Sequence, residues 1–168
     1  LQQVFSRVLV RLGIKDLGSV KEDGVDMKRA VVLLGAFRIG TSFIDSLIRS
    51  NHDLINEIMV VDFNPVVKEE MNKRGIPYVY ADISHPDTLM HAGISHAEVV
   101  VCSIEDVFLR GITNLKLVEV IGRICPNAKI IVTGDTAEQS LELYSAGADL
   151  VLYPSALAAD HLIHSVAS

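Results

Sequence analysis

The chain has 168 residues and a formal net charge of −6, with 21 acidic against 15 basic side chains. This length suits one α/β domain with a sizeable core. An acidic surface is a poor partner for the phosphates of DNA or RNA, so we expect no nucleic-acid binding. No stretch of the sequence holds the roughly 18 consecutive apolar residues that a membrane span needs, and no signal-peptide pattern is present.

The first 27 residues differ from the rest. Apolar side chains recur there at helical spacing, at Leu1, Val4, Phe5, Val8, Leu9 and Leu12. A charged, glycine-containing stretch, GSVKEDGVD at 18–26, follows and predicts a linker. The helix suits packing on its own domain or on a partner subunit better than lying on a membrane surface. We therefore expect 1–27 to form an amphipathic helix and linker, and 28–168 to form one domain.

From residue 28 onward, apolar strand-like runs alternate with helical segments. The predicted strands are 29–34, 57–63, 77–82, 97–103, 128–133 and 148–153. The predicted helices are 41–50, 65–74, 86–92, 107–124, 136–146 and 155–166. Six strand–helix units with right-handed crossovers predict a Rossmann-like α/β fold, a doubly wound parallel sheet of order 3-2-1-4-5-6 with helices on both faces.

The turn after the first strand reads GAFRIG, residues 35–40. Gly35 permits a tight turn, and Gly40 permits close packing of the next helix on its strand. The unpaired N–H groups at the start of that helix attract an anion, and Arg38 adds a charged donor suited to phosphate oxygens. The turn therefore predicts the phosphate end of a nucleotide site, although two glycines alone are also common at strand–helix corners.

The second strand ends at Asp62, 22 residues after Gly40. A carboxylate at this place accepts hydrogen bonds from both ribose hydroxyls and disfavours the 2′-phosphate of NADP. The carboxyl ends of the strands should meet at one crevice. The candidate ligand-binding residues there are Gly35, Ala36, Phe37, Arg38, Ile39, Gly40, Asp62, Phe63, Asn64, Asp82, Ile83 and Ser103.

Phe37 stands where a G-x-G-x-x-G loop has its middle glycine, which lets a pyrophosphate approach the backbone. A side chain there narrows the approach for a dinucleotide more than for a mononucleotide. We therefore favour an adenine nucleotide (AMP, ADP or ATP) as the ligand, and keep NAD(H) as an alternative that Phe37 disfavours.

Catalytic groups are scarce, so we expect no enzyme activity and no metal site. The six histidines show no metal-ligand spacing, and neither a G-x-S-x-G elbow nor a cysteine with a base is present. Cys102 and Cys125 belong to no C-x-x-C motif, and we interpret both as reduced thiols.

Several phrases resemble the TrkA-N domain, also called the RCK N-terminal or KTN domain. They are VVLLGAFRIG, VVDFNP, YVYADISHPDTLMHAGISHAEVVV, NAKIIV and YSAGADLVLYPSALAADHL. The resemblance covers about 29–166, and FLRGITNLKLVEVIGRICPNAKIIVT is most similar to the Kef-type cation/proton antiporters. These domains regulate potassium channels, Trk-type uptake systems and Kef-type antiporters.

This resemblance implies a regulatory nucleotide-binding domain at the cytoplasmic face of the cell membrane, joined in one polypeptide to a transmembrane antiporter or channel. It also implies that 1–27 connects to that membrane domain. By resemblance, Asp62 faces the ribose, Asp82 and Ile83 face the adenine, and 35–40 faces the phosphates. The family dimerises through the last helix, here about 155–166, whose apolar stripe is equally compatible with self-packing.

Three functional hypotheses remain open at this point. The first is a nucleotide-sensing module that gates potassium or sodium transport in an antiporter, or in a potassium channel. The second is a fragment of an NAD-dependent oxidoreductase, which would need a separate substrate domain. The third is a purely structural dimerisation domain whose glycine loop has degenerated.

Overall fold

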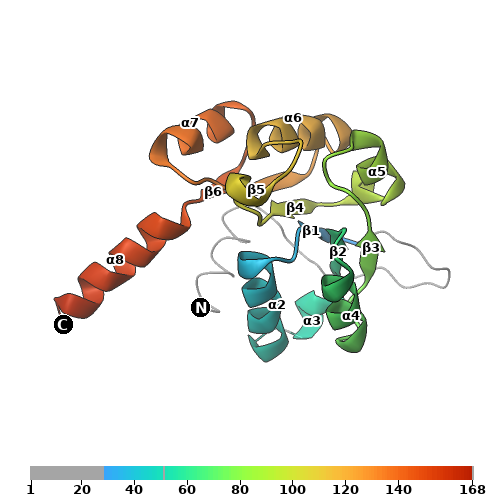
Figure 1. The fold of residues 1–168 in the computed structure, drawn as a ribbon, viewed down its shortest axis with the longest axis horizontal. Coiled ribbons are helices and arrows are strands. Elements are labelled where there is room, and N and C mark those ends of the chain that lie inside the picture. Colours follow the sequence, from blue (N-terminus) through green and yellow to red (C-terminus); the bar gives the residue numbers. More distant parts are fainter. Residues whose placement is uncertain (1–28, 51, 168) are drawn as a thin grey trace.

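The computed structural model describes residues 29–50 and 52–167 (Figure 1). The predicted amphipathic helix and linker at 1–27 lie outside the described residues. Within the described ranges, no helix is both long and apolar enough to cross a membrane.

One parallel sheet of six strands forms the centre of the domain (Figure 1). Its order is β3-β2-β1-β4-β5-β6, which confirms the predicted doubly wound arrangement. The strands are β1 (Val31–Leu34), β2 (Ile58–Asp62), β3 (Tyr78–Tyr80), β4 (Val99–Cys102), β5 (Lys129–Thr133) and β6 (Leu150–Leu152). The central strands β1, β2 and β4 are buried along their whole length, as expected for a sheet covered on both faces.

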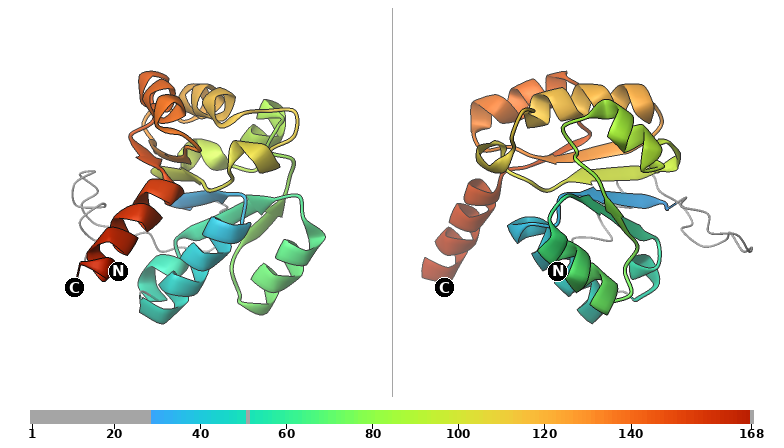
Figure 2. Two further views of the ribbon diagram at one scale, coloured as in Figure 1. Left: turned by 60° about the vertical axis from the view of Figure 1, so that its left-hand side comes forward. Right: turned by 45° about the vertical axis from the view of Figure 1, so that its right-hand side comes forward.

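Helices cover both faces of the sheet (Figure 2). One layer holds α2 (Arg38–Ser50), α3 (His52–Ile55) and α4 (Pro65–Lys73). The opposite layer holds α5 (Pro86–His91), α6 (Asn114–Ile124) and α7 (Ala137–Ser145). The connections from β1 to β3 therefore cover one face of the sheet, and those from β3 to β6 cover the other. The chain changes face between β3, at the edge of the sheet, and β4.

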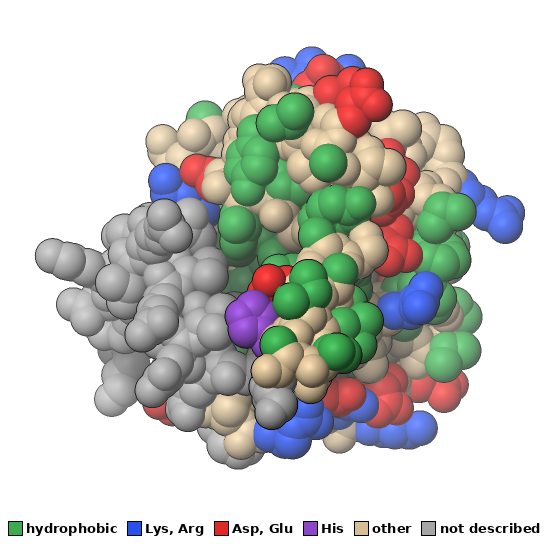
Figure 3. All heavy atoms as spheres, turned by 90° about the vertical axis from the view of Figure 1, so that its left-hand side faces the viewer, with side chains coloured by type: hydrophobic (Ala, Val, Ile, Leu, Met, Phe, Trp, Pro, Cys, Tyr) green, Lys and Arg blue, Asp and Glu red, His purple; other side chains and the backbone are tan. Residues whose placement is uncertain are grey.

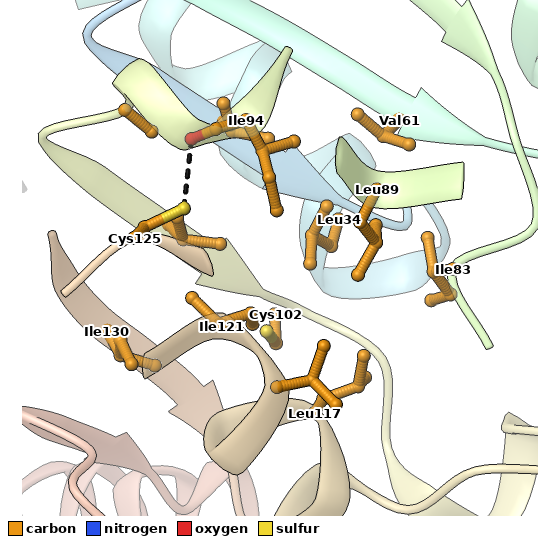
Figure 4. Close-up of a cluster of buried hydrophobic side chains, with 14 of the residues drawn as sticks. Leu34, Val61, Ile83, Leu89, Ile94, Cys102, Leu117, Ile121, Cys125 and Ile130 are labelled. Carbon is orange, nitrogen blue, oxygen red and sulfur yellow. Dashed lines mark hydrogen bonds between the residues drawn. The ribbon is translucent and has the colours of Figure 1, made fainter. Parts of the chain in front are cut away.

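Two hydrophobic cores result, one on each face. The larger core packs α5, α6 and α7 against the sheet through side chains such as Leu89, Leu117 and Ile121 (Figure 4). Cys125 belongs to this core and donates its thiol hydrogen to the carbonyl of Ile94, 3.0 Å away. Cys102 is also buried, and burial raises the pKa of its thiol to about 12. Both cysteines are free, in agreement with the prediction of two reduced thiols.

Helix boundaries follow the capping signals of the sequence in most places. Asn64 caps α4 by accepting a hydrogen bond from the N–H of Val66, and Pro65 is the first helical residue. The glycines after α4, α5 and α7 have positive φ angles, which side chains rarely adopt.

The predicted helix at 107–124 was wrong in its first part. The structure has a 3₁₀ turn at Asp106–Phe108, then a loop, and α6 begins only at Asn114. Gly111 in this loop has φ +75°, which no helix accommodates, and Thr113 caps α6 by accepting from the N–H of Lys116. The prediction for α2 also began too late, because Arg38 to Gly40 already form its first turn.

The last helix, α8 (Pro154–Val166), projects from the body of the domain (Figures 1 and 2). The structure describes every residue of α8, and none of them is buried. Leu157, Leu162, Ile163 and Val166 expose between 61% and 87% of their surface. Self-packing of this helix, which the sequence left open, is therefore absent in the described chain. Figure 3 looks onto the side from which α8 projects and shows hydrophobic side chains gathered there.

The docking of α7 depends on one side chain. Within α7, Leu143 is fully buried, whereas Leu141 on the same helix is 70% exposed. We expect Leu143→Ala to lower the free energy of unfolding by about 2–5 kcal/mol, because it removes core contacts and leaves a cavity. Leu141→Ala should change it by less than about 0.5 kcal/mol. Urea denaturation followed by circular dichroism measures both, and equal losses would contradict the packing described here.

Candidate functional site

The loop between β1 and α2 turns back tightly over the sheet. Gly35 has φ +78° and donates its N–H to the carbonyl of Val61, 2.9 Å away. Thr41 then donates its N–H to the carbonyl of Phe37 (2.7 Å) and its hydroxyl to the carbonyl of Ala36 (2.8 Å). These bonds direct α2 so that its first turn begins at the carboxyl end of β1.

Both glycines of the loop lie where a side chain would collide. A Cβ atom on Gly35 would lie 2.0 Å from Cδ1 of Ile104. A Cβ atom on Gly40 would lie 2.6 Å from the carbonyl oxygen of Gly35 and 2.6 Å from the hydroxyl of Ser103. The two glycines therefore permit the close approach of helix and strand that the sequence predicted.

Asp62 ties this loop to the next strand. One carboxylate oxygen accepts from the N–H of Ala36 at 2.9 Å, and the other accepts from the N–H of Asn64 at 2.7 Å. The residue is only 7% exposed. A carboxylate offers about four acceptor directions, so two of them remain beyond these bonds.

Ser103 supports the same loop from β4. Its hydroxyl donates to the carbonyl of Gly35 at 2.5 Å, and the residue is 3% exposed. The sequence grouped Ser103 with the ligand contacts. The structure brings it to the loop, where its hydroxyl hydrogen is already used.

The first turn of α2 leaves its N–H groups without intrahelical partners, at residues 38–40. This turn contains no acidic residue, so nothing in the helix itself neutralises the positive end of the helix dipole. Arg38 is the charged side chain of the turn, and its side chain is 67% exposed. This end of the helix is suited to an anion.

The segment that follows β4 meets the loop through Phe108, a residue that the sequence did not connect to it. The rings of Phe37 and Phe108 pack edge to face, with centroids 5.1 Å apart and planes at 65°. The guanidinium carbon of Arg38 lies 5.9 Å from the centre of the Phe108 ring, and its Nη1 lies 3.9 Å from Oε2 of Glu105. The prediction of a helix from residue 107 concealed this contact, because it assigned Phe108 to a helical face.

Buried and half-buried polar side chains hold this segment in place. Asp106 accepts from the N–H of Asn114 (2.6 Å) and from the side-chain amide of Gln139 (2.7 Å). Its own N–H donates to Asp135 at 3.1 Å, and the fully buried Asn114 donates to the carbonyls of Ile104 and Thr133. Burial and the nearby charges of Asp106 and Glu105 raise the pKa of Asp135. Among the described residues, no group of three or more His, Cys, Asp or Glu side chains could hold a metal ion.

Asp82 lies after β3 and is held locally. Oδ1 accepts from both the hydroxyl (2.7 Å) and the N–H (2.9 Å) of Ser84, and these bonds, the hydroxyl foremost, keep the pKa of Asp82 below its usual value. His85 Nδ1 lies 3.3 Å from Oδ2. Ile83 is 4% exposed and packs in the larger core, so its side chain faces inward and only its backbone remains for an outside ligand.

The loop after β2 presents Phe63 and Asn64. Phe63 is 54% exposed, while Asn64 uses its side chain to cap α4. Tyr78 donates its hydroxyl to the carbonyl of Asp62 at 2.6 Å, and burial raises its pKa to about 12, with smaller contributions from the charge of Asp62 and from Tyr80. The structure thus joins 35–40, Asp62, Asn64 and Ser103 through hydrogen bonds, whereas the carboxylate of Asp82 accepts from Ser84 instead.

Comparison with known proteins agrees with this architecture. The family model of the TrkA-N domain matches residues 31–154. A glutathione-regulated potassium-efflux system protein KefC of Enterobacter sp. (strain 638) is 31% identical over 93 residues, covering 55% of this chain and 14% of its own length. The KefC of Salmonella arizonae is 28% identical over 146 residues, covering 86% of this chain and 22% of its own. The chain therefore spans less than a quarter of the length of these relatives.

Solved structures share the fold. The TrkA-N domain of the Escherichia coli inner membrane protein ybaL superposes with a TM-score of 0.71 at 17% identity, covering 83% of this chain and 98% of that one. A Shewanella denitrificans Kef C-terminal domain in an AMP-bound form gives 0.61 at 18% identity, covering 82% and 78%. The GsuK channel bound to NAD gives 0.61 at 20% identity, covering 90% and 25%, and a GsuK structure bound to ADP gives 0.60 at 19%, covering 89% and 37%.

The close approach at Gly40 makes a sharp test of the loop. Gly→Ala inside a helix normally stabilises by about 0.5–1 kcal/mol, and we expect this gain for Gly122→Ala in α6, where an added Cβ meets nothing within 4 Å. Gly40→Ala should instead destabilise by about 1–3 kcal/mol, because its Cβ would press on the Gly35 carbonyl. Urea denaturation compares the two variants. Stabilisation by both would show that the helix does not lie as close to the loop as described.

Proposed function

This chain belongs to the TrkA-N domain family, and on that premise we propose that it is a regulatory domain that binds an adenine nucleotide between the β1–α2 loop and Asp62. The observation that carries the proposal is the arrangement of the loop. Asp62 holds the N–H of Ala36, and the open first turn of α2 stands beside Arg38. Hydrogen-bond donors for a phosphate and an acceptor for a ribose hydroxyl therefore lie at adjoining strand ends.

Each part of the nucleotide has a proposed position. The phosphate lies against residues 37–40 and accepts from the first N–H groups of α2 and from Arg38. A ribose hydroxyl donates to the remaining acceptor directions of Asp62. The adenine lies toward Phe63 and Asn64 and the backbone of 82–83, where the exposed ring of Phe63 offers an apolar face.

The ligand class follows from the loop and from the related structures. Related domains were solved with AMP, ADP and NAD. In this chain Phe37 replaces the glycine that a pyrophosphate would approach, so we propose an adenine mononucleotide in preference to NAD(H).

The proposed role is regulation of potassium or sodium transport in an antiporter of the same polypeptide, at the cytoplasmic face of the membrane. The relatives at 27–31% identity are potassium-efflux system proteins KefC and a chloroplastic K(+) efflux antiporter of Arabidopsis thaliana, in which the matched region is a minor part of the length. The domain itself carries out no chemistry in this proposal. Nucleotide binding shifts the transporter between states by its differential affinity for them.

The binding proposal predicts ligand-dependent stability. AMP at about 100 times its Kd should raise the free energy of unfolding by about 2.7 kcal/mol, measured by thermal shift. Arg38→Ala should weaken AMP binding about tenfold, because a charged donor to the phosphate is lost. Arg49→Ala, at the last turn of the same helix, is the control and should leave the affinity unchanged. Absence of any shift with AMP, ADP, ATP, NAD and NADH would overturn the proposal.

We also propose that α8 mediates a homodimer. Its exposed Leu157, Leu162, Ile163 and Val166 have no cover in the described chain, and burying such side chains in a second copy removes them from water. A monomer–dimer equilibrium is expected in analytical ultracentrifugation of the native chain. Leu162→Asp with Ile163→Asp should shift it to monomer, whereas Ser155→Asp with Ser165→Asp, which adds the same charge to the same helix, should not. A native chain that remains monomeric at high micromolar concentration would contradict this proposal.

A further inference from the structure

The contact between Phe37 and Phe108 lies at the point where the sheet reverses its strand order. β1 is followed by β2 on one side and by β4 on the other, so the reversal lies between β1 and β4. In sheets of this kind a dinucleotide extends across that point, with one half over each set of strands. Phe37 comes from the loop after β1 and Phe108 from the segment after β4, so the pair spans the gap between the two sets.

The aromatic pair is backed by close packing. Ile104 fills the space directly above Gly35, where its Cδ1 would lie 2.0 Å from an added Cβ. The bonds of Asp106 with Asn114 and Gln139 fasten the rest of the segment to α6 and α7. Phe37 and Phe108 are still 44% and 45% exposed, so their outer surfaces face an arriving ligand. A ligand that crossed from β1 to β4 would have to displace one of the rings.

The charges of the segment after β4 limit the number of phosphates that the ligand can carry toward it. Arg38 is the cation at the loop, and Glu105 at 3.9 Å partly neutralises it. Asp106 and Asp135 belong to the same acidic group, because the N–H of Asp106 donates to Asp135, and burial together with the charges of Asp106 and Glu105 raises the pKa of Asp135. A first phosphate at α2 meets Arg38 and the helix dipole, whereas a second or third phosphate directed toward β4 would approach three carboxylates.

We propose that Phe108 and Glu105 are specificity-determining residues that limit this nucleotide site to a single phosphate. The proposal rests on the proposed function and names its ligand class as nucleoside monophosphates. Phe108, with Phe37, blocks the passage of a second nucleotide across the β1–β4 gap. Glu105 disfavours additional phosphates by repulsion and by holding Arg38.

Isothermal titration of AMP, ATP and NAD to the native chain and its variants tests the proposal. The native chain should bind AMP at least tenfold more tightly than ATP or NAD. Phe108→Ala should strengthen NAD binding about tenfold and change AMP binding less than threefold. Glu105→Gln should strengthen ATP binding relative to AMP by about fivefold. Val107→Ala, an exposed neighbour in the same 3₁₀ turn, is the matched control and should leave all three affinities unchanged.

A second variant tests the same prediction independently of whether Phe108→Ala folds. Phe37→Ala removes the other ring, and it should produce the same gain for NAD. The double variant should gain less than the product of the two single effects, because removal of either ring already opens the same passage. Circular dichroism verifies the fold of each variant.

The outcomes separate this proposal from the proposed function. If AMP binds and Arg38→Ala weakens it, but Phe108→Ala leaves the ratio of NAD to AMP affinity unchanged, the specificity proposal alone fails. The specificity proposal also fails if the native chain binds ATP and AMP with equal affinity and Arg110→Ala weakens the binding of ATP. That result would mean that Arg110, the next cation of the segment, accommodates the additional phosphates. If the native chain binds none of the three ligands, both proposals fail.

Discussion

The carboxylate of Asp62 holds together the two loops that flank the proposed nucleotide site. The register that pairs Leu34 of β1 with Val61 of β2 places Asp62 beside the turn at Gly35 and Ala36. Its two oxygens then accept one N–H from each of the two loops, in a position that is almost entirely buried. Buried N–H groups without acceptors cost about 1–3 kcal/mol each, so this side chain stabilises both loops at once. The direction of α2, and with it the open N–H groups of its first turn, follows from that arrangement.

The carboxyl ends of β1 and β4 meet over the same loop. Ser103 holds the carbonyl of Gly35, and Ile104 packs above it, while Phe108 closes on Phe37. The segment from Ile104 to Thr113 is anchored in turn to α6 and α7 through Asp106. Arg38 contacts Phe108 and Glu105 of this segment, which is bonded to α7, the helix that precedes β6 and the exposed α8. In the proposed function, this continuity of contacts is the route by which nucleotide binding biases the position of α8, with a leverage set by the ligand's differential affinity.

Much of the fold could be predicted from the sequence, because local signals and chain topology agree. The alternation of strands and helices determines the sheet order, and Asn64 with Pro65 determines where α4 begins. The helix predicted from residue 107 was wrong in its first part, because the apolar spacing of 107–124 suggested a helix that Gly111 interrupts. Gly111 has a positive φ angle, which a right-handed helix does not allow. The contact of Phe108 with Phe37 could not be predicted, because it joins residues that the sequence separates by three strands. The sequence also did not predict that Ile83 and Ser103 are buried, because the pattern at a strand end does not indicate whether a side chain points into the core or toward a ligand.

A crystal structure of this chain grown with AMP tests the central claim most directly. The account predicts the phosphate within hydrogen-bond distance of the N–H groups of 38–40, and a ribose hydroxyl on Asp62 with the bond from Ala36 retained. The phosphate should also draw Arg38 away from Glu105. Electron density for AMP at another surface, or a complex in which the loop at 35–40 makes no contact with the nucleotide, would contradict it.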